Sequence, residues 1–274
     1  MTEIGAGVID RGSGPPVLFL HGQPGTGASW DPVSDLLVDE FRVIAPDRAG
    51  YGPDSVEARG IAGNADLAAT LLDRVDGGPA VVVAHSWAGG VAVLLAERRP
   101  DLVRSLVLVG AACTPDSLNG LDRLLGVRLV GDALMVGGLL AFGEVLPMLR
   151  KLSPRVPARF RDQFRASLPD QGVFGGELGS FGRHRRTVRT EQRALISEMP
   201  MVTNALGRVE VPTMVVVGEW DKVVRPKVGE TLFGLIPGAS RVVVKRAGHF
   251  LARDNPNELA RLIRLSGRED AVRQ

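Results

Sequence analysis

The sequence predicts an α/β fold with a mostly parallel sheet, flanking helices and an inserted helical cap. Short apolar runs of strand length recur along the chain, and segments with helical spacing separate them. This alternation is typical of parallel sheets. It stops between about residues 114 and 208, where the chain is helical in pattern and rich in arginine. We therefore predict a core domain formed by residues 1–113 and 209–274, with residues 114–208 as the cap.

The first part of the chain carries five of these strands. Residues 16–20 are apolar throughout and end in a glycine-rich loop, which indicates a strand covered on both faces. The other strands are expected at residues 8–9, 41–45, 81–84 and 105–109. Helical spacing, and a proline that stops the last helix, indicate helices at about residues 29–38, 64–75 and 89–99.

The alternation of strands and helices resumes after the cap. Residues 213–218 form the next apolar run, and a helix is expected to follow Pro226. A strand at residues 241–245 comes next, and a last helix at about residues 255–265 precedes a charged tail. These segments complete the predicted core.

Composition limits the classes of function. The 274 residues carry a formal net charge of +2, with 45% hydrophobic and 23% charged residues, which is ordinary for a globular protein and does not suggest nucleic-acid binding. A single cysteine excludes an internal disulfide and fits a reducing compartment. The first residues do not resemble a leader, and no apolar run is long enough to span a membrane. We expect a cytoplasmic location; composition leaves the oligomeric state open.

The stretch around Ser86 is where chemistry is expected. Residues 81–84 form an apolar strand that runs toward this serine, and small residues with two glycines follow it. A tight strand–turn–helix of this kind is a nucleophile elbow, although its strict form has glycine where this chain has Ala84 and Ala88. The N-terminus of the following helix favours developing negative charge. The alternative is a serine that only caps a helix.

A serine hydroxyl needs a base beside it to attack at neutral pH. The chain has four histidines, His21, His85, His184 and His249. His249 follows the last strand, at the sheet edge where ligands bind in such folds, and is the candidate base unless it only packs on Phe250. His21 is expected to brace a glycine turn, and His184 to lie on a charged, solvated face. His85 adjoins Ser86 but is expected to face away from it.

The base in turn needs a carboxylate that orients it. Asp221 follows the strand at residues 213–218, in the loop next to that of His249, and is the candidate. Glu219 is its rival but lies closer to the strand. The other place for an acid, after residues 105–109, offers no carboxylate before Asp116. The alternative for Asp221 is a helix cap.

The oxyanion that forms during acyl transfer needs two hydrogen-bond donors. The backbone N–H of Trp87, directly after the nucleophile, is one candidate, and the N–H of Gln23, in the loop after residues 16–20, is the other. Both roles belong to the main chain, so side-chain substitutions test them poorly. We expect Trp30, Trp87 and Phe250 to line the substrate pocket, together with apolar side chains of the cap.

Taken together, these segments resemble the α/β-hydrolase fold over nearly the whole chain. The resemblance rests on five short motifs, at residues 21–24, 47–52, 84–88, 218–221 and 248–249. Their serine, acid and histidine follow one another in the family's order. The resemblance implies that the loop around Asp47 is structural and stabilises the strand end beside the oxyanion loop.

We therefore expect a serine hydrolase of the carboxylesterase type, which cleaves an ester or related acyl bond of a small to medium, apolar substrate through an acyl-enzyme on Ser86. No cofactor and no metal is expected. A haloperoxidase-like perhydrolase, a C–C bond hydrolase and a lyase or cyclase would use the same residues, and a ligand receptor could keep them. Epoxide hydrolases and haloalkane dehalogenases attack with an aspartate instead, and the cap contains no tyrosine to hold an epoxide oxygen.

Overall fold

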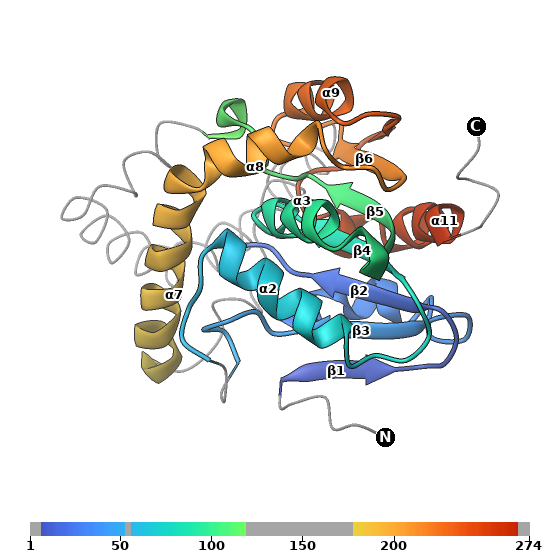
Figure 1. Cartoon of the computed structure of the whole chain (residues 1–274), viewed down its shortest axis with the longest axis horizontal. Coiled ribbons are helices and arrows are strands. Elements are labelled where there is room, and N and C mark those ends of the chain that lie inside the picture. The colour runs from blue at the N-terminus through green and yellow to red at the C-terminus, as the bar shows by residue number, and fades with distance from the viewer. Residues whose placement is uncertain (1–6, 53–55, 119–177, 268–274) are drawn as a thin grey trace, which may run out of the picture.

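The protein, seen in a computed structural model that describes residues 7–52, 56–118 and 178–267, is built around a seven-stranded sheet (Figure 1). The strand order is β1-β3-β2-β4-β5-β6-β7, and only β1 runs antiparallel to its neighbour within this sheet. The strands are β1 (Val8–Arg11), β2 (Pro16–Leu20), β3 (Arg42–Pro46), β4 (Ala80–His85), β5 (Val103–Val109), β6 (Thr213–Gly218) and β7 (Ser240–Val244). The predicted α/β fold with a mostly parallel sheet is confirmed.

Helices connect the strands, as the alternation predicts. They are η1 (Gly27–Trp30), α1 (Asp31–Ser34), α2 (Ile61–Leu72), α3 (Ala88–Arg98), η2 (Pro100–Leu102), η3 (Pro115–Ser117), α7 (Leu178–Ser197), α8 (Met199–Leu206), α9 (Pro226–Leu235), α10 (Leu251–Asp254) and α11 (Pro256–Gly267). The helix expected at residues 29–38 is shorter, because α1 ends at Ser34 and the chain continues in turns. The helix α10 was not expected, since four residues are too few to show a helical period.

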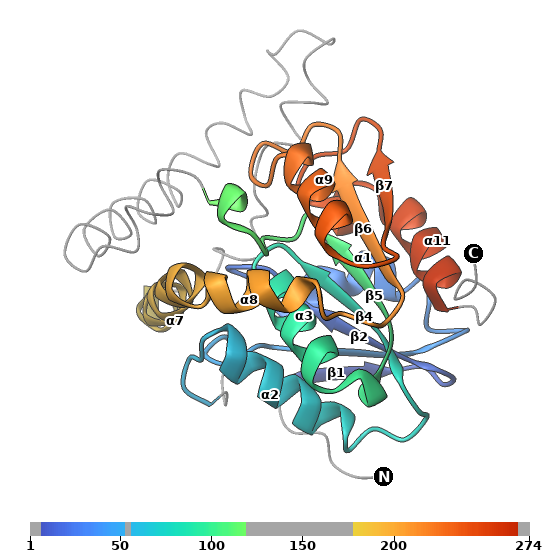
Figure 2. The same ribbon diagram turned by 45° about the horizontal axis from the view of Figure 1, so that its top comes forward.

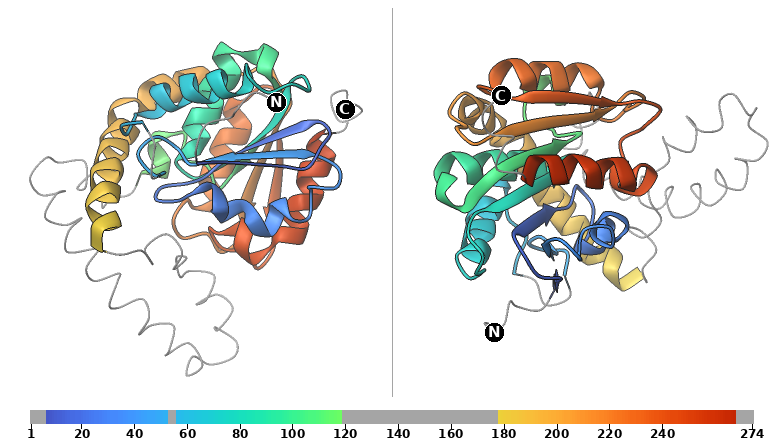
Figure 3. Two further views of the ribbon diagram at one scale, coloured as in Figure 1. Left: turned by 90° about the horizontal axis from the view of Figure 1, so that it is seen from below. Right: turned by 90° about the vertical axis from the view of Figure 1, so that its right-hand side faces the viewer.

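The sheet separates two hydrophobic clusters, because successive side chains of a strand point to opposite faces. In β4, Val82 and Ala84 join the cluster that includes residues of α2, α3, α8 and α9, while Val81 and Val83 join the cluster that includes residues of α10 and α11. Figures 2 and 3 show helices in layers on the two sides of the sheet. All four side chains are fully buried, so the end of β4 has a rigid support on both faces.

The end of the predicted cap packs on the core. In α8, Val202 and Leu206 are fully buried in the same cluster as the apolar side chains of α3. The helix α7 precedes α8 and extends along one side of the molecule (Figure 1, yellow). Residues 119–177 of the predicted cap lie outside the described residues, so the domain boundaries stay a prediction. In the part of the chain that the structure describes, no helix is long and apolar enough to cross a membrane.

The parallel strands bring the predicted motifs to one edge of the sheet. His21 follows β2, Ser86 follows β4, Asp221 is the third residue after the end of β6, and His249 lies beyond β7. Because β2, β4, β5, β6 and β7 pair in parallel, their carboxyl ends lie side by side. This is the edge at which open α/β sheets bind ligands.

Candidate active site

Ser86 lies at the tip of the turn between β4 and α3. Its φ of +55° is in the left-handed region, where a non-glycine residue is strained, and such residues cluster at active sites. Main-chain hydrogen bonds hold the turn. The Ser86 N–H donates to the Val109 carbonyl, and the Ser86 carbonyl accepts from the N–H groups of Gly89 and Ala112, all at 3.0 Å. The strand–turn–helix geometry of an elbow is therefore present at this serine.

Close packing explains the small residues around the serine. Ala84 and Ala88 are fully buried, so a larger side chain at either position would have to displace packed neighbours. A Cβ atom on Gly22 would come 2.8 Å from His85 Nδ1 and 3.2 Å from Ser86 Cβ. Glycine at position 22 thus allows the loop after β2 to approach the elbow.

His249 and Asp221 form a buried pair. His249 Nδ1 lies 2.7 Å from Asp221 Oδ2, and the exposed fractions of the two residues are 5% and 3%. The carboxylate accepts, so Nδ1 carries the proton and Nε2 is left as the basic nitrogen. Asp221 Oδ1 also accepts from the N–H groups of Val223 (2.8 Å) and Val224 (2.9 Å), which fixes the carboxylate in place.

The rival carboxylates interact elsewhere. Glu219 is exposed, and its Oε2 accepts from the Arg246 N–H at 2.8 Å. Asp116 accepts from the hydroxyls of Thr114 and Thr231. Of the three acids considered from the sequence, the structure therefore places Asp221 against the histidine.

Ser86 and His249 line the same cavity, which has a volume of about 150 Å³. Its wall includes His21, Gly22, Gln23, Pro24, Gly25, Ser29, Trp30, His85, Ser86, Val109, Val223, His249, Phe250, Ala252 and Arg253. Trp30 and Phe250 are thus at the wall, as the sequence predicts, whereas Trp87 is not among the described residues that line it. The hydrogen bonds of His249 in the described part of the chain go to Asp221 and His85, and none joins it to the Ser86 hydroxyl.

His85 does not face away from the site, contrary to the expectation from its place on the strand. Its ring lines the cavity, and the ring centroids of His85 and His249 are 4.5 Å apart. His85 Nε2 donates to the His249 carbonyl at 2.9 Å, which ties the loop of His249 to the elbow. Strand alternation explains this orientation, because His85 shares the face of Val81 and Val83, and that face packs against the side of the sheet that carries Trp30 and Leu251.

The pKa of His85 leads to a prediction for stability against pH. Burial, and next the nearby His249, lower the pKa of His85 to about 3. In the unfolded chain the ring titrates near 6.5, so the unfolded state binds more protons between these values and the free energy of unfolding falls as pH falls from about 6.5 toward 3. In His85→Gln this fall should be shallower by up to about 1.4 kcal/mol per pH unit. Urea unfolding of both proteins at pH 7.5, 6 and 5 measures it, and equal slopes would contradict it.

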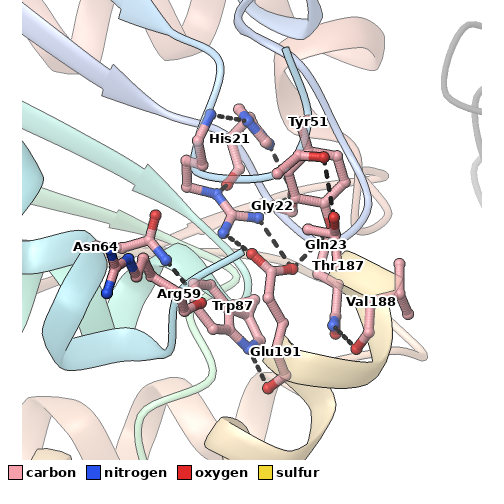
Figure 4. A network of polar contacts seen from close by, with 12 residues as sticks. His21, Gly22, Gln23, Tyr51, Arg59, Asn64, Trp87, Thr187, Val188 and Glu191 are labelled. Carbon is pink, nitrogen blue, oxygen red and sulfur yellow. Dashed lines mark hydrogen bonds and ion pairs between the residues drawn. The ribbon is translucent and has the colours of Figure 1, made fainter. Parts of the chain in front are cut away.

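The side chains of Gln23 and Trp87 point toward α7 (Figure 4). Gln23 Nε2 donates to the Val188 carbonyl at 3.0 Å. The Trp87 indole is 1% exposed, and its Nε1 donates to the Glu191 carbonyl at 3.0 Å. The two residues proposed as main-chain oxyanion donors are therefore both anchored by their side chains to one helix. This explains why the Trp87 ring is absent from the described cavity wall.

Sequence reasoning missed the partners of these residues. The guanidinium of Arg48, in the motif at residues 47–52, forms a buried ion pair with Glu191 of α7. His21 braces its loop as expected, since its Nε2 accepts from the Arg48 N–H at 2.9 Å. Asp47 also acts structurally, and its Oδ1 accepts from the Gly27 N–H at 2.8 Å. A lone acid within an arginine-rich helix gives no signal in the sequence that it is buried.

A parallel sheet with a strained serine after its central strand, and an acid–histidine pair after two later strands, defines the class of α/β hydrolases. The chain belongs to the alpha/beta hydrolase family, whose model matches residues 17–262.

Several of the similar proteins are named as hydrolases or esterases. The 2-(acetamidomethylene)succinate hydrolase of Mesorhizobium japonicum is 30% identical over 255 residues, which cover 91% of this chain and 86% of that protein. The 2-hydroxymuconate semialdehyde hydrolase of Pseudomonas putida is 29% identical over 272 residues, covering 93% and 87%. A thermophilic esterase from Thermogutta terrifontis superposes with a TM-score of 0.70 at 25% identity, covering 94% and 90%. The names of these similar proteins thus point to more than one substrate.

Proposed function

We propose that this protein is a serine carboxylesterase with Ser86 as nucleophile, His249 as base and Asp221 as the acid that orients it. The observation that carries the proposal is that Ser86 and His249 share one cavity wall while Asp221 holds Nδ1 of the histidine. With Nδ1 engaged, Nε2 is the nitrogen available to a serine hydroxyl. This is the arrangement that activates a weak nucleophile.

The reaction has two half-reactions. Ser86 Oγ attacks the ester carbonyl carbon while His249 Nε2 takes the hydroxyl proton, and the carbonyl oxygen becomes an oxyanion. The N–H groups of Gln23 and Trp87 stabilise this oxyanion. Collapse of the tetrahedral intermediate breaks the bond to the alkoxide, which leaves with the proton from His249. Water, deprotonated by the same histidine, then releases the acid from the acyl-serine.

The cavity supports a small to medium, largely apolar substrate. Trp30, Val109, Val223 and Phe250 contribute apolar surface to its wall. The side chain of Arg253, also at the wall, is paired with Asp254 at 2.7 Å and lies with its guanidinium carbon 5.0 Å from the Phe250 ring centroid. The described wall thus favours an uncharged acyl group over a carboxylate.

C–C bond hydrolysis is the second candidate, because a relative that covers most of this chain is a 2-hydroxymuconate semialdehyde hydrolase. In that reaction Ser86 Oγ would attack the ketone carbon as His249 Nε2 takes its proton, and the C–C bond would break with its electron pair going to the departing carbon, which takes the proton from His249. Water would then release the acid from the acyl-serine as in ester hydrolysis.

A substrate panel separates the two. It contains p-nitrophenyl esters with acyl chains of two to about twelve carbons, matched esters that end in a carboxylate, and a vinylogous 1,5-diketone acid. We expect the highest kcat/KM on short, uncharged esters. Turnover of the diketone above all esters would replace the proposal with C–C hydrolysis. The absence of both ester turnover and fluorophosphonate labelling would remove the proposed nucleophile.

A further inference from the structure

A buried polar cluster joins α7 to the loops around the elbow. The side chains of Glu191 and Arg48 form an ion pair, and the two residues are 0% and 4% exposed. The Tyr51 hydroxyl donates to Glu191 Oε2 at 2.7 Å. Figure 4 shows Glu191 between His21, Gly22 and Gln23 on one side and Trp87 on the other. None of these contacts belongs to the proposed triad, so the cluster needs a separate explanation.

The ion pair holds one particular carbonyl group. Arg48 Nη2 donates to the Gly22 carbonyl at 2.9 Å, and Arg48 Nε donates to the His21 carbonyl at 2.8 Å. His21 Nδ1 is a second donor to the Gly22 carbonyl, also at 2.9 Å. Gly22 thus has its carbonyl fixed by a cation that is itself fixed by Glu191.

The Gly22 carbonyl shares a peptide unit with the N–H of Gln23. A trans peptide is planar, and its C=O and N–H point in opposite directions. An anchor on the Gly22 carbonyl therefore sets the direction of the Gln23 N–H, the proposed oxyanion donor. Hydrogen bonding to the carbonyl from a cation also polarises the same unit, which strengthens its N–H as a donor.

The second proposed donor depends on the same two residues. The Trp87 ring lies under the Arg48 guanidinium, whose carbon is 4.5 Å from the ring centroid. Its indole N–H donates to the main-chain carbonyl of Glu191 at 3.0 Å. Glu191 is thus linked to Gln23 through its carboxylate, Arg48 and the Gly22 carbonyl. It is linked to Trp87 through its own main-chain carbonyl, which accepts from the indole N–H.

We propose that Glu191 of α7 is a positioning residue, which acts through Arg48 to hold the Gln23 and Trp87 N–H groups in the geometry of an oxyanion hole. This inference rests on the proposed function for its catalytic consequence. Its structural content, the orientation of two backbone amides, can be measured without turnover.

Glu191→Gln is the sharpest test, because it keeps the shape of the side chain and removes its charge. Loss of one oxyanion donor costs about 10² to 10³ in kcat, so a displaced donor should lower kcat by about 10- to 100-fold. KM should change by less than about threefold, because the donors act on the transition state. The Ki of a trifluoromethyl ketone, which forms the oxyanion, should rise in step with the loss.

Glu198→Gln is the matched control. Glu198 lies just after α7, and its Oε2 accepts from the Ala62 N–H at the start of α2, at 2.8 Å. The same substitution there removes a partly buried carboxylate that holds α2 and not the oxyanion loop. We expect kcat within about threefold of wild type. Equal losses of kcat in both variants would show a general effect of disturbing this segment and would overturn the proposal.

Two further measurements keep the test decisive. In ¹⁵N spectra, the amide signals of Gln23 and Trp87 should shift in Glu191→Gln and stay in place in Glu198→Gln.

If Glu191→Gln fails to fold, the double variant Arg48→Met/Glu191→Gln removes both charges of the ion pair, an exchange that buried ion pairs often tolerate. The double variant should fold and have a kcat about 10- to 100-fold below that of wild type, and near-wild-type turnover would overturn the proposal. If wild type hydrolyses no ester, the proposed function fails, and the amide signals alone decide the inference.

Discussion

Ser86→Ala is expected to abolish hydrolysis of every ester that the wild-type protein cleaves. The loss in kcat should be about 10⁴ to 10⁶, because without the hydroxyl no acyl-enzyme forms and His249 has no proton to take. The residual rate would come from the oxyanion donors and from binding. Stopped assays with a p-nitrophenyl ester measure the loss, and a fluorophosphonate probe should label wild type and leave the variant unlabelled.

Ser29→Ala is the control for that result. Ser29 lines the same cavity, and its Oγ accepts a long hydrogen bond from the Thr26 N–H at 3.4 Å, away from Ser86 and His249. Its removal should change kcat by less than about threefold. The assignment is wrong if Ser86→Ala keeps wild-type turnover with an unchanged circular dichroism spectrum, or if labelling persists in it.

The core of the fold was predictable because its strands are buried on both faces. β4 and β5 are apolar almost throughout, so their patterns depend on local sequence and on nothing distant. The helix α1 shows the limit of such reasoning. Apolar residues such as Val33 and Leu37 keep a helical spacing and are both buried, yet Leu37 lies in a turn beyond the helix.

The site was predictable only in part. The order of Ser86, Asp221 and His249 along the chain suggested the triad, because parallel strands must end at one edge. The orientation of the His85 ring beside His249, and of the Trp87 ring toward α7, depends on contacts between segments that are distant in the sequence. Arg48 and Glu191 are 143 residues apart, and no local pattern pairs them. The residues of the proposed triad can therefore be picked out from the sequence, whereas the contacts of Arg48 and Glu191 with the loop after β2 are seen only in the structure.

Asp221→Asn should lower kcat by about 10⁴ while the protein stays folded. Asp221 Oδ2 accepts a hydrogen bond from His249 Nδ1–H at 2.7 Å, which keeps the proton on Nδ1 and leaves Nε2 to act as the base. An asparagine side chain that turns its amide toward Nδ1 would donate there, which favours the wrong tautomer. It would also leave the imidazolium of the transition state without a counter-charge.

Glu219→Gln is the comparison that makes this result specific. Both acids lie in the loop after β6, two residues apart, but Glu219 is exposed and bound to the Arg246 N–H. Its neutralisation removes the same charge from the same loop without touching His249, so kcat should fall by less than about threefold. If Glu219→Gln lost more activity than Asp221→Asn, the acid partner of His249 in the working enzyme would be Glu219, and the loop would have to rearrange when substrate binds.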